Sequence, residues 1–276
     1  MLVSTLLYSV LIPGVIAFAI ALVGRRTEIA LAIAIFAATV AGSWSVVGRP
    51  ELVPDDISRW LGHLALLGAV AAIASSILRG SERRVWAVRV IAALGASYLV
   101  LRPILAHRWG LPTGLVVVGG AAATLVIYGG ALDQVLRRTS PRVGITVALV
   151  SMATSAATVA ASGSLTIAQI GGGAAAGVGA IWVLALVRPA PAPSLAYVVA
   201  PISWAVVVIG MLYAAMPWHV AVLALSAPLV ACLGLFAPRS GLRAAIPVGL
   251  ALAIAGVSIR LAVAPPPVED EAEYGY

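Results

Sequence analysis

Apolar runs of about twenty residues, separated by short polar segments, constrain this chain most strongly. A helix needs about 20 residues, at a rise of about 1.5 Å each, to cross a hydrocarbon core of about 30 Å. Residues 29–47 and 64–78 are almost continuously apolar, without the alternation of a transmembrane β-barrel strand. With 62% hydrophobic and only 10% charged residues, the 276-residue chain is too apolar for a soluble domain. The sequence predicts an all-α, polytopic integral membrane helix bundle.

About ten runs are long enough to span a membrane. The predicted spans are 2–23, 28–47, 61–79, 85–106, 112–132, 143–161, 165–187, 195–215, 218–236 and 243–263. The first run lacks a basic start and ends at Gly24-Arg25-Arg26 instead of a small-residue cleavage site, so we expect a retained helix. Residues 264–276 are proline-led and acidic, which predicts a disordered tail.

The arginines indicate how the bundle lies in the membrane. Twelve of the seventeen follow odd-numbered spans, and five lie on the other face with seven acids. Because arginine is retained on the cytoplasmic side, both termini are predicted to be non-cytoplasmic, in a cytoplasmic (inner) membrane. We call the face with twelve arginines the arginine-rich face. Orientation also explains the net charge of +7, so no nucleic-acid partner is expected.

Two absences in the sequence exclude kinds of chemistry. There is no lysine, which excludes a lysine Schiff base and the lysine of a phosphate-binding loop. Cys232 is the only cysteine, so the chain can form neither an internal disulfide nor a cysteine-rich metal site.

Small hydroxyl residues form the clearest polar pattern within a span. They fall within an arc of about 100° on the sixth predicted helix. They are Ser151, Thr154, Ser155, Thr158 and Ser162. Gln169 adds an amide to the next span. This hydroxyl stripe, with Gln169, either lines a transport path or packs against other helices, and the sequence leaves both open.

Other charged and small residues have structural and functional interpretations. Arg89 and Arg102 lie about 20 Å apart along one span, near enough to its ends to snorkel. An inward Arg102 would instead suit an anionic solute group on the transport path. Asp133 is expected to pair with Arg137 at the surface. Gly173 and Gly177 have the GxxxG spacing of close helix packing.

The histidines His63, His107 and His219, near the outer face, have no metal-binding spacing, so neither a metal nor a cofactor is expected. Asp55 and Asp56 are predicted to cap the third span. No carboxylate is predicted deep within a span, and no arrangement of catalytic residues stands out, so the chain is not predicted to be an enzyme.

Two functions follow as hypotheses. The first is a transporter or permease for a small uncharged or anionic solute, in which two sets of five helices could form an inverted pair. The alternative is a non-catalytic scaffold or subunit of a larger membrane complex. Besides the lipid bilayer, its partners would be a protein bound through the C-terminal tail or a second copy of the chain.

Overall fold

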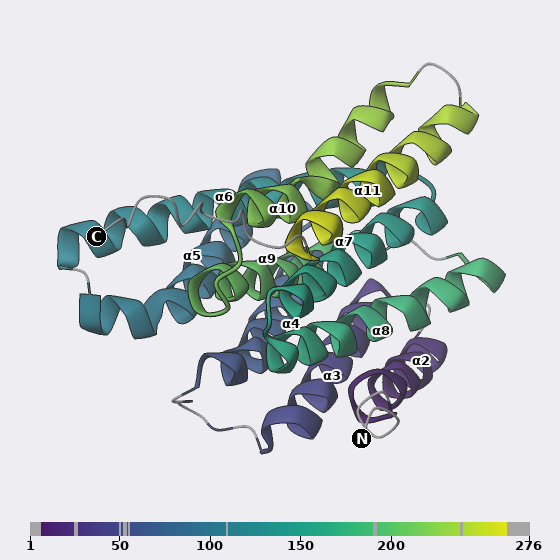
Figure 1. The fold of residues 1–276 in the computed structure, drawn as a ribbon. Coiled ribbons are helices and arrows are strands. Elements are labelled where there is room, and N and C mark those ends of the chain that lie inside the picture. Colours follow the sequence, from purple (N-terminus) through teal and green to yellow (C-terminus); the bar gives the residue numbers. More distant parts are fainter. Residues whose placement is uncertain are drawn as a thin grey trace, which may run out of the picture.

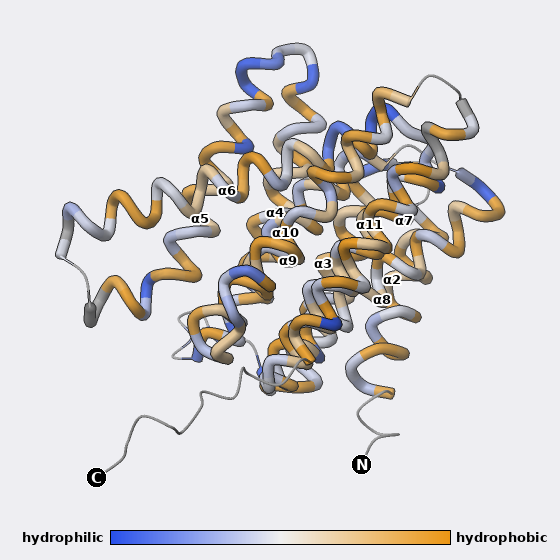
Figure 2. Tube along the Cα trace, turned by 45° about the horizontal axis from the view of Figure 1, so that its top comes forward, coloured by the Kyte–Doolittle hydropathy of each residue, from blue (hydrophilic) through white to orange (hydrophobic). Residues whose placement is uncertain are grey.

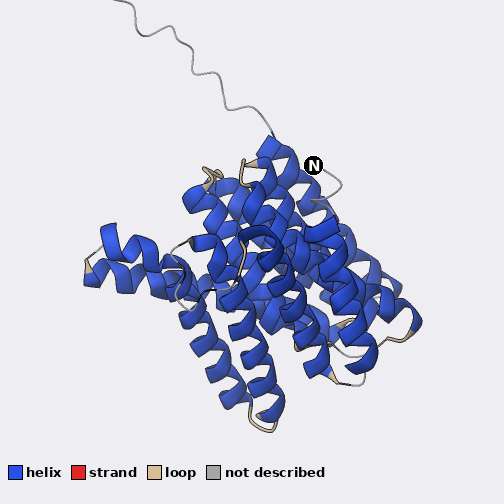
Figure 3. Ribbon diagram, turned by 90° about the horizontal axis from the view of Figure 1, so that it is seen from below, coloured by secondary structure: helices blue, strands red, loops and turns tan. Residues whose placement is uncertain are grey.

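The computed structural model describes residues 7–24, 27–49, 51, 54, 56–108, 110–189, 192–237 and 240–263. Within these ranges the protein is helical and has no strands (Figure 3). Its long helices are α2 (Ile12–Gly24), α3 (Glu28–Val47), α4 (Trp60–Ile77), α5 (Glu82–Arg108), α6 (Leu111–Arg138), α7 (Pro141–Ala161), α8 (Leu165–Val187), α9 (Leu195–Tyr213), α10 (Trp218–Leu233) and α11 (Ser240–Val263). Three short helices adjoin them: η1 (Leu7–Leu11), η2 (Ile57–Arg59) and η3 (Gly234–Phe236).

Ten of the described helical segments are long and apolar enough to cross a membrane. The prediction of an all-α, polytopic membrane bundle is therefore confirmed. Hydrophobic residues run along the helices, and hydrophilic residues gather mostly near their ends (Figure 2). The predicted disordered tail, residues 264–276, lies outside the described residues.

The structure departs most from the predicted spans at α5 and α6. Helix α6 runs to Arg138, six residues beyond the predicted end at residue 132, and α5 is longer at both ends. The reason for the longer α6 is local. Arg137 and Arg138 lie in its last turn, where cations complement the helix dipole, and Arg137 pairs with Asp133 one turn earlier. Asp133 thus lies inside a spanning helix and not in a loop.

Side chains also cap helices at both faces. Thr27 accepts a hydrogen bond from the Ala30 backbone N–H at 3.3 Å and begins α3. Asp56 accepts one from Ser58 at 2.7 Å and begins η2, which leads directly into α4. The predicted capping role of Asp56 is confirmed, whereas Asp55 lies outside the described residues.

Helix α9 occupies the centre of the bundle (Figure 1). It packs against α3 to α8 and against α10, and 83% of its spanning window is buried. Helices α2, α3 and α8 pack together on one side, and the α5–α6 hairpin extends on another (Figure 1). Residues of α9 therefore face almost every part of the interior.

The α2–α3–α8 group is held by close backbone approach. A Cβ on Gly177 would lie 2.7 Å from the Ala38 Cβ, and one on Gly173 would lie 3.3 Å from the Gly42 Cα. Side chains larger than hydrogen at these two positions would push α8 away from α3. The GxxxG pair thus lies where α8 approaches its neighbours most closely.

The two sets of five spans share some contacts. Each long helix can be matched with the helix five places later in the chain. The packed hairpin α2–α3 then corresponds to α7–α8, and α5–α6 corresponds to α10–α11. The pairs α3–α8 and α4–α9 map onto themselves, and both are in contact. Because five is odd, the second set enters the membrane from the opposite face. The extensive contacts α2–α8, α7–α9 and α7–α11 have no comparable counterparts among the described residues, so an inverted repeat stays a prediction.

Candidate functional site

A buried ion pair joins α5 to α6 near the arginine-rich face. Arg89 donates through Nη2 to Oδ2 of Asp133 at 2.7 Å. The side chains are 15% and 8% exposed, so both charges are largely removed from solvent. Arg137, one turn after Asp133, donates from Nε to the other carboxylate oxygen at 2.8 Å. The predicted pairing of Asp133 with Arg137 is confirmed, but Asp133 is buried and does not lie at the surface as predicted. Arg89 is a second, more deeply buried partner.

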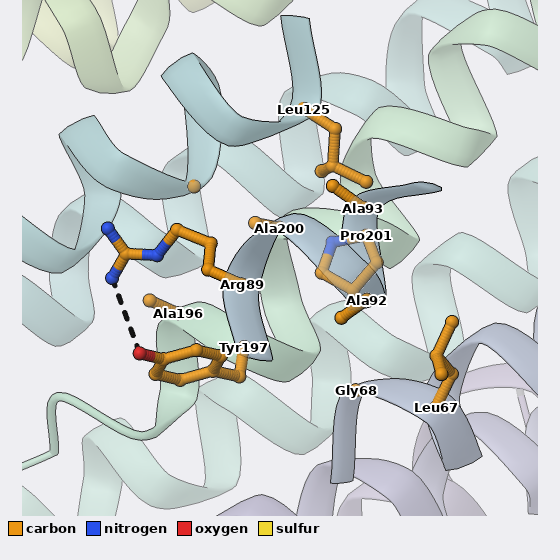
Figure 4. A pocket seen from close by; sticks show the side chains of 11 residues that line it. Leu67, Gly68, Arg89, Ala92, Ala93, Leu125, Ala196, Tyr197, Ala200 and Pro201 are labelled. Carbon is orange, nitrogen blue, oxygen red and sulfur yellow. Dashed lines mark hydrogen bonds between the residues drawn. The ribbon is translucent and has the colours of Figure 1, made fainter. Parts of the chain in front are cut away.

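Helix α9 contributes an aromatic wall to this pair. The Arg89 guanidinium lies 5.4 Å from the ring centroid of Tyr197, and its Nη2 is 3.4 Å from the Tyr197 hydroxyl. On its own helix, Arg89 lies 6.0 Å from the ring of Trp86. Figure 4 shows Arg89 reaching from α5 toward the Tyr197 hydroxyl. Three helices therefore position one cation, with aromatic faces as additional partners.

Arg89 stands between two cavities of different character. The larger, about 410 Å³, is polar and lies toward the ends of α5 and α6 at the arginine-rich face. We call it the vestibule; its walls are Arg79, Glu82, Val85, Trp86, Arg89, Asp133, Gln134 and Arg137. On the other side of Arg89 lies an apolar cavity of about 30 Å³ between α4, α5, α6 and α9 (Figure 4). That volume accommodates only a water or two.

A small polar cavity adjoins the vestibule and shares Arg79 and Arg137 with it. Arg79, after α4, forms an ion pair with Glu28 at the start of α3. Ser194, just before α9, donates to the Glu28 carbonyl oxygen at 2.8 Å. Ser75, also in the wall, is 6% exposed, and its hydroxyl has no hydrogen-bond partner among the described residues. Five helices thus bring polar groups to the arginine-rich end of the bundle.

The hydroxyl stripe lies inside the bundle on α7. Ser151, Thr154, Ser155 and Thr158 are at most 2% exposed, whereas Ser162 is half-buried. Thr154, Thr158 and Ser162 each donate to a backbone carbonyl of their own helix four residues earlier, at 2.7 to 2.9 Å. No stripe residue lines any of the five described cavities. That the stripe lines a path stays a prediction.

One member of the stripe meets polar groups from two other helices at mid-span. The Tyr128 hydroxyl on α6 has two hydroxyl neighbours, that of Ser151 and that of Ser203 on α9. Neither Tyr128 nor Ser151 makes a well-formed hydrogen bond within the described part of the chain. Ser203 donates to the sulfur of Met152 at 2.9 Å. Three helices therefore place hydroxyls together in the core.

The remaining predicted site residues lie apart from Arg89. Arg102 is exposed, with its guanidinium 5.6 Å from the ring centroid of Trp60, and Gln169 is half-buried on α8. Neither lines a described cavity. His63 lies beside Trp60 on α4, and His219 beside Trp218 on α10. Within the described ranges, no three potential ligands gather for a metal.

Sequence reasoning identified Arg89 and Asp133 but gave neither a role in a site. The usable signal was that a span with an arginine two turns from its end needs a counter-charge, and Asp133 is the one acid near the end of the following span. Tyr197 and Ser75 gave no such signal, because a tyrosine and a serine are ordinary in membrane helices.

The chain matches no protein-family model, and neither a curated protein nor a solved structure is significantly similar to it.

Proposed function

We propose that this chain is a membrane transport protein for a small uncharged or anionic solute, which reaches Arg89 through the vestibule. The observation that carries the proposal is the position of the Arg89–Asp133 pair. It lies within the spanning helices, between a polar cavity of about 410 Å³ and the closed interior. Ionisable groups held inside a membrane bundle are costly, and they commonly mark the route of a polar solute.

The proposed transport cycle treats the two sets of five spans as inverted repeats that pack differently. Helix α7 packs against α9, α10 and α11, whereas its counterpart α2 packs mainly against α3 and α8. When two inverted repeats adopt different arrangements, exchanging those arrangements produces a state open to the opposite face. Arg89 and Tyr197 lie on α5 and α9, next to the α4–α9 contact that maps onto itself. In the proposed mechanism, transport through this site uses that exchange.

A cysteine-accessibility experiment tests transport without knowing the solute. Cys232→Ser first removes the only native thiol. Ala93→Cys then places a thiol in the apolar cavity, and Ala174→Cys, on fully buried Ala174 of α8, is the matched control. An anionic, membrane-impermeant thiosulfonate is added to intact cells or to inside-out vesicles. We expect the Ala93→Cys protein to react from both faces and the control from neither.

Reaction of the Ala93→Cys protein from one face only, under all conditions, would contradict a transport cycle and favour the scaffold function.

The same assay tests the hydroxyl stripe. Thr154→Val with Thr158→Val should leave insertion and thermal stability nearly intact, because both hydroxyls bond only within α7. If the stripe lines the path, labelling from the far face should slow by about tenfold. An unchanged rate would leave the stripe as a packing surface.

A further inference from the structure

Guanidinium N–H groups around the vestibule outnumber the acceptors that receive them. Each guanidinium carries five N–H donors. Arg89 uses Nη2, and Arg137 uses Nε, to bind the two oxygens of Asp133. Within the described part of the chain, the two terminal nitrogens of Arg137 and the Nη1 and Nε of Arg89 make no hydrogen bond. One carboxylate therefore serves two guanidiniums and leaves most of their donors without a protein partner.

The adjoining polar cavity adds a further cation and a free donor. Arg79 pairs with Glu28, so these connected cavities hold three arginines and three carboxylates, of which Glu28 and Asp133 are ion-paired and Glu82 is exposed. The Ser75 hydroxyl, 94% buried and without a described partner, faces the cavity that Arg79 and Arg137 share. A buried hydroxyl without a partner costs free energy unless something accepts its hydrogen. The guanidinium N–H groups without a protein partner and the Ser75 hydroxyl are donors that a bound acceptor would satisfy.

We infer that the vestibule binds a small oxyanion, a carboxylate or phosphate group, between Arg89 and Arg137. Without a ligand, the Asp133 carboxylate is the acceptor that both guanidiniums bind. The inference narrows the proposed function by naming the charge and chemistry of its solute. Two guanidinium forks suit an oxyanion because each offers paired N–H donors at the spacing of carboxylate or phosphate oxygens.

Glu82 is the remaining acid in the vestibule wall. It is exposed in the first turn of α5, where it complements the positive end of the helix dipole. Water and salt screen an exposed charge far more than the largely buried pair of Arg89 and Asp133. Glu82 therefore reduces the attraction for an anion at the mouth without neutralising Arg89, whereas Arg137, whose side chain is 44% exposed, is screened as Glu82 is. A volume of about 410 Å³ leaves room for a phosphate-sized ion with some of its water.

Thermal unfolding with inorganic phosphate tests the site on the full chain in nanodiscs of zwitterionic phosphatidylcholine. Phosphate should raise the melting temperature of the wild type by about 2–4 °C at saturating concentration, and chloride at equal ionic strength should not. Asp133→Asn should melt lower without phosphate and bind it about tenfold more tightly, because the internal competitor is lost. Arg89→Gln should abolish the phosphate effect.

Glu51→Gln is the matched control, since it removes a carboxylate from the Arg59–Glu51 ion pair on the other face. It should respond to phosphate as the wild type does. Repeating the scan in nanodiscs containing phosphatidic acid identifies the source of the oxyanion. If phosphatidic acid raises the melting temperature and added phosphate raises it no further, the site binds a lipid headgroup. If free phosphate competes with phosphatidic acid, the site binds a soluble anion.

Absence of phosphate and phosphatidic acid protection in both the wild type and Asp133→Asn would overturn the inference. The outcome is independent of the transport test. Oxyanion binding with thiol labelling from one face only would support the binding site and contradict the transport function. Labelling from both faces without oxyanion binding would support transport and contradict the binding site.

Discussion

Replacing Asp133 by leucine should destabilise the bundle by about 3 kcal/mol, because it leaves Arg89 largely buried without its carboxylate. Arg89→Leu should cost less, about 1–2 kcal/mol, since Asp133 retains Arg137 as a partner. The double variant Arg89→Leu with Asp133→Leu should recover most of the loss, because replacing both charges by apolar side chains removes the desolvation cost along with the attraction. Unfolding in mixed micelles, followed by tryptophan fluorescence, measures all three.

Arg102→Leu provides the control for this cycle. Arg102 is an arginine of the same helix, but it is exposed and contacts the Trp60 ring. Its loss should change the free energy of unfolding by about 1 kcal/mol or less. If the two single variants at the ion pair were as mild as Arg102→Leu, the pair would contribute nothing beyond a surface contact. The stable double variant should also have lost its response to phosphate, which separates binding from folding.

Gly68→Ala should destabilise the protein by about 1–3 kcal/mol, although it adds a single methyl group. A Cβ on Gly68 would lie 2.5 Å from the Tyr197 carbonyl oxygen and 2.9 Å from the Val198 Cα. Both atoms belong to the backbone of α9, so the two helices must separate to admit it. The separation would also shift Tyr197 away from Arg89, and phosphate should then protect less.

Gly62→Ala is the matched substitution on the same helix. A Cβ at Gly62 meets nothing within 4 Å, so the change should stabilise α4 by up to about 1 kcal/mol through helix propensity. Opposite signs at the two glycines are the expected result, read as melting temperatures in the same detergent. Equal effects would show that helix propensity, and not the approach of α4 to α9, decides the cost at Gly68.

The number and type of the helices could be predicted from the sequence because apolar length is a local property that the membrane makes decisive. Helix ends were less predictable where charge and helix overlap. Asp133 and Arg137 read as a loop by hydropathy, yet their i,i+4 pair stabilises the last turns of α6. Asp133 and Arg137 therefore lie within α6, beyond the end that hydropathy predicts for this span.

The candidate site could be predicted only in part because its members come from separate helices. The hydroxyl stripe is visible in sequence, since its residues repeat along one helix. The contact of Arg89 with Tyr197 joins residues 108 positions apart, and that of Arg89 with Asp133 joins residues 44 apart. Which faces of α5, α6 and α9 meet depends on tertiary packing that no local pattern contains.

The central place of α9 has a consequence for how the protein is made. The chain is synthesised from its N-terminus, so α3 to α8 enter the membrane before α9, which packs against all of them. Until the eighth span is inserted, the surfaces that will cover Ile202 and Trp204, both almost fully buried in the finished protein, face lipid chains. Insertion of α9 must therefore displace lipid from the surfaces of α3 to α8 that it contacts, before α10 and α11 complete the bundle.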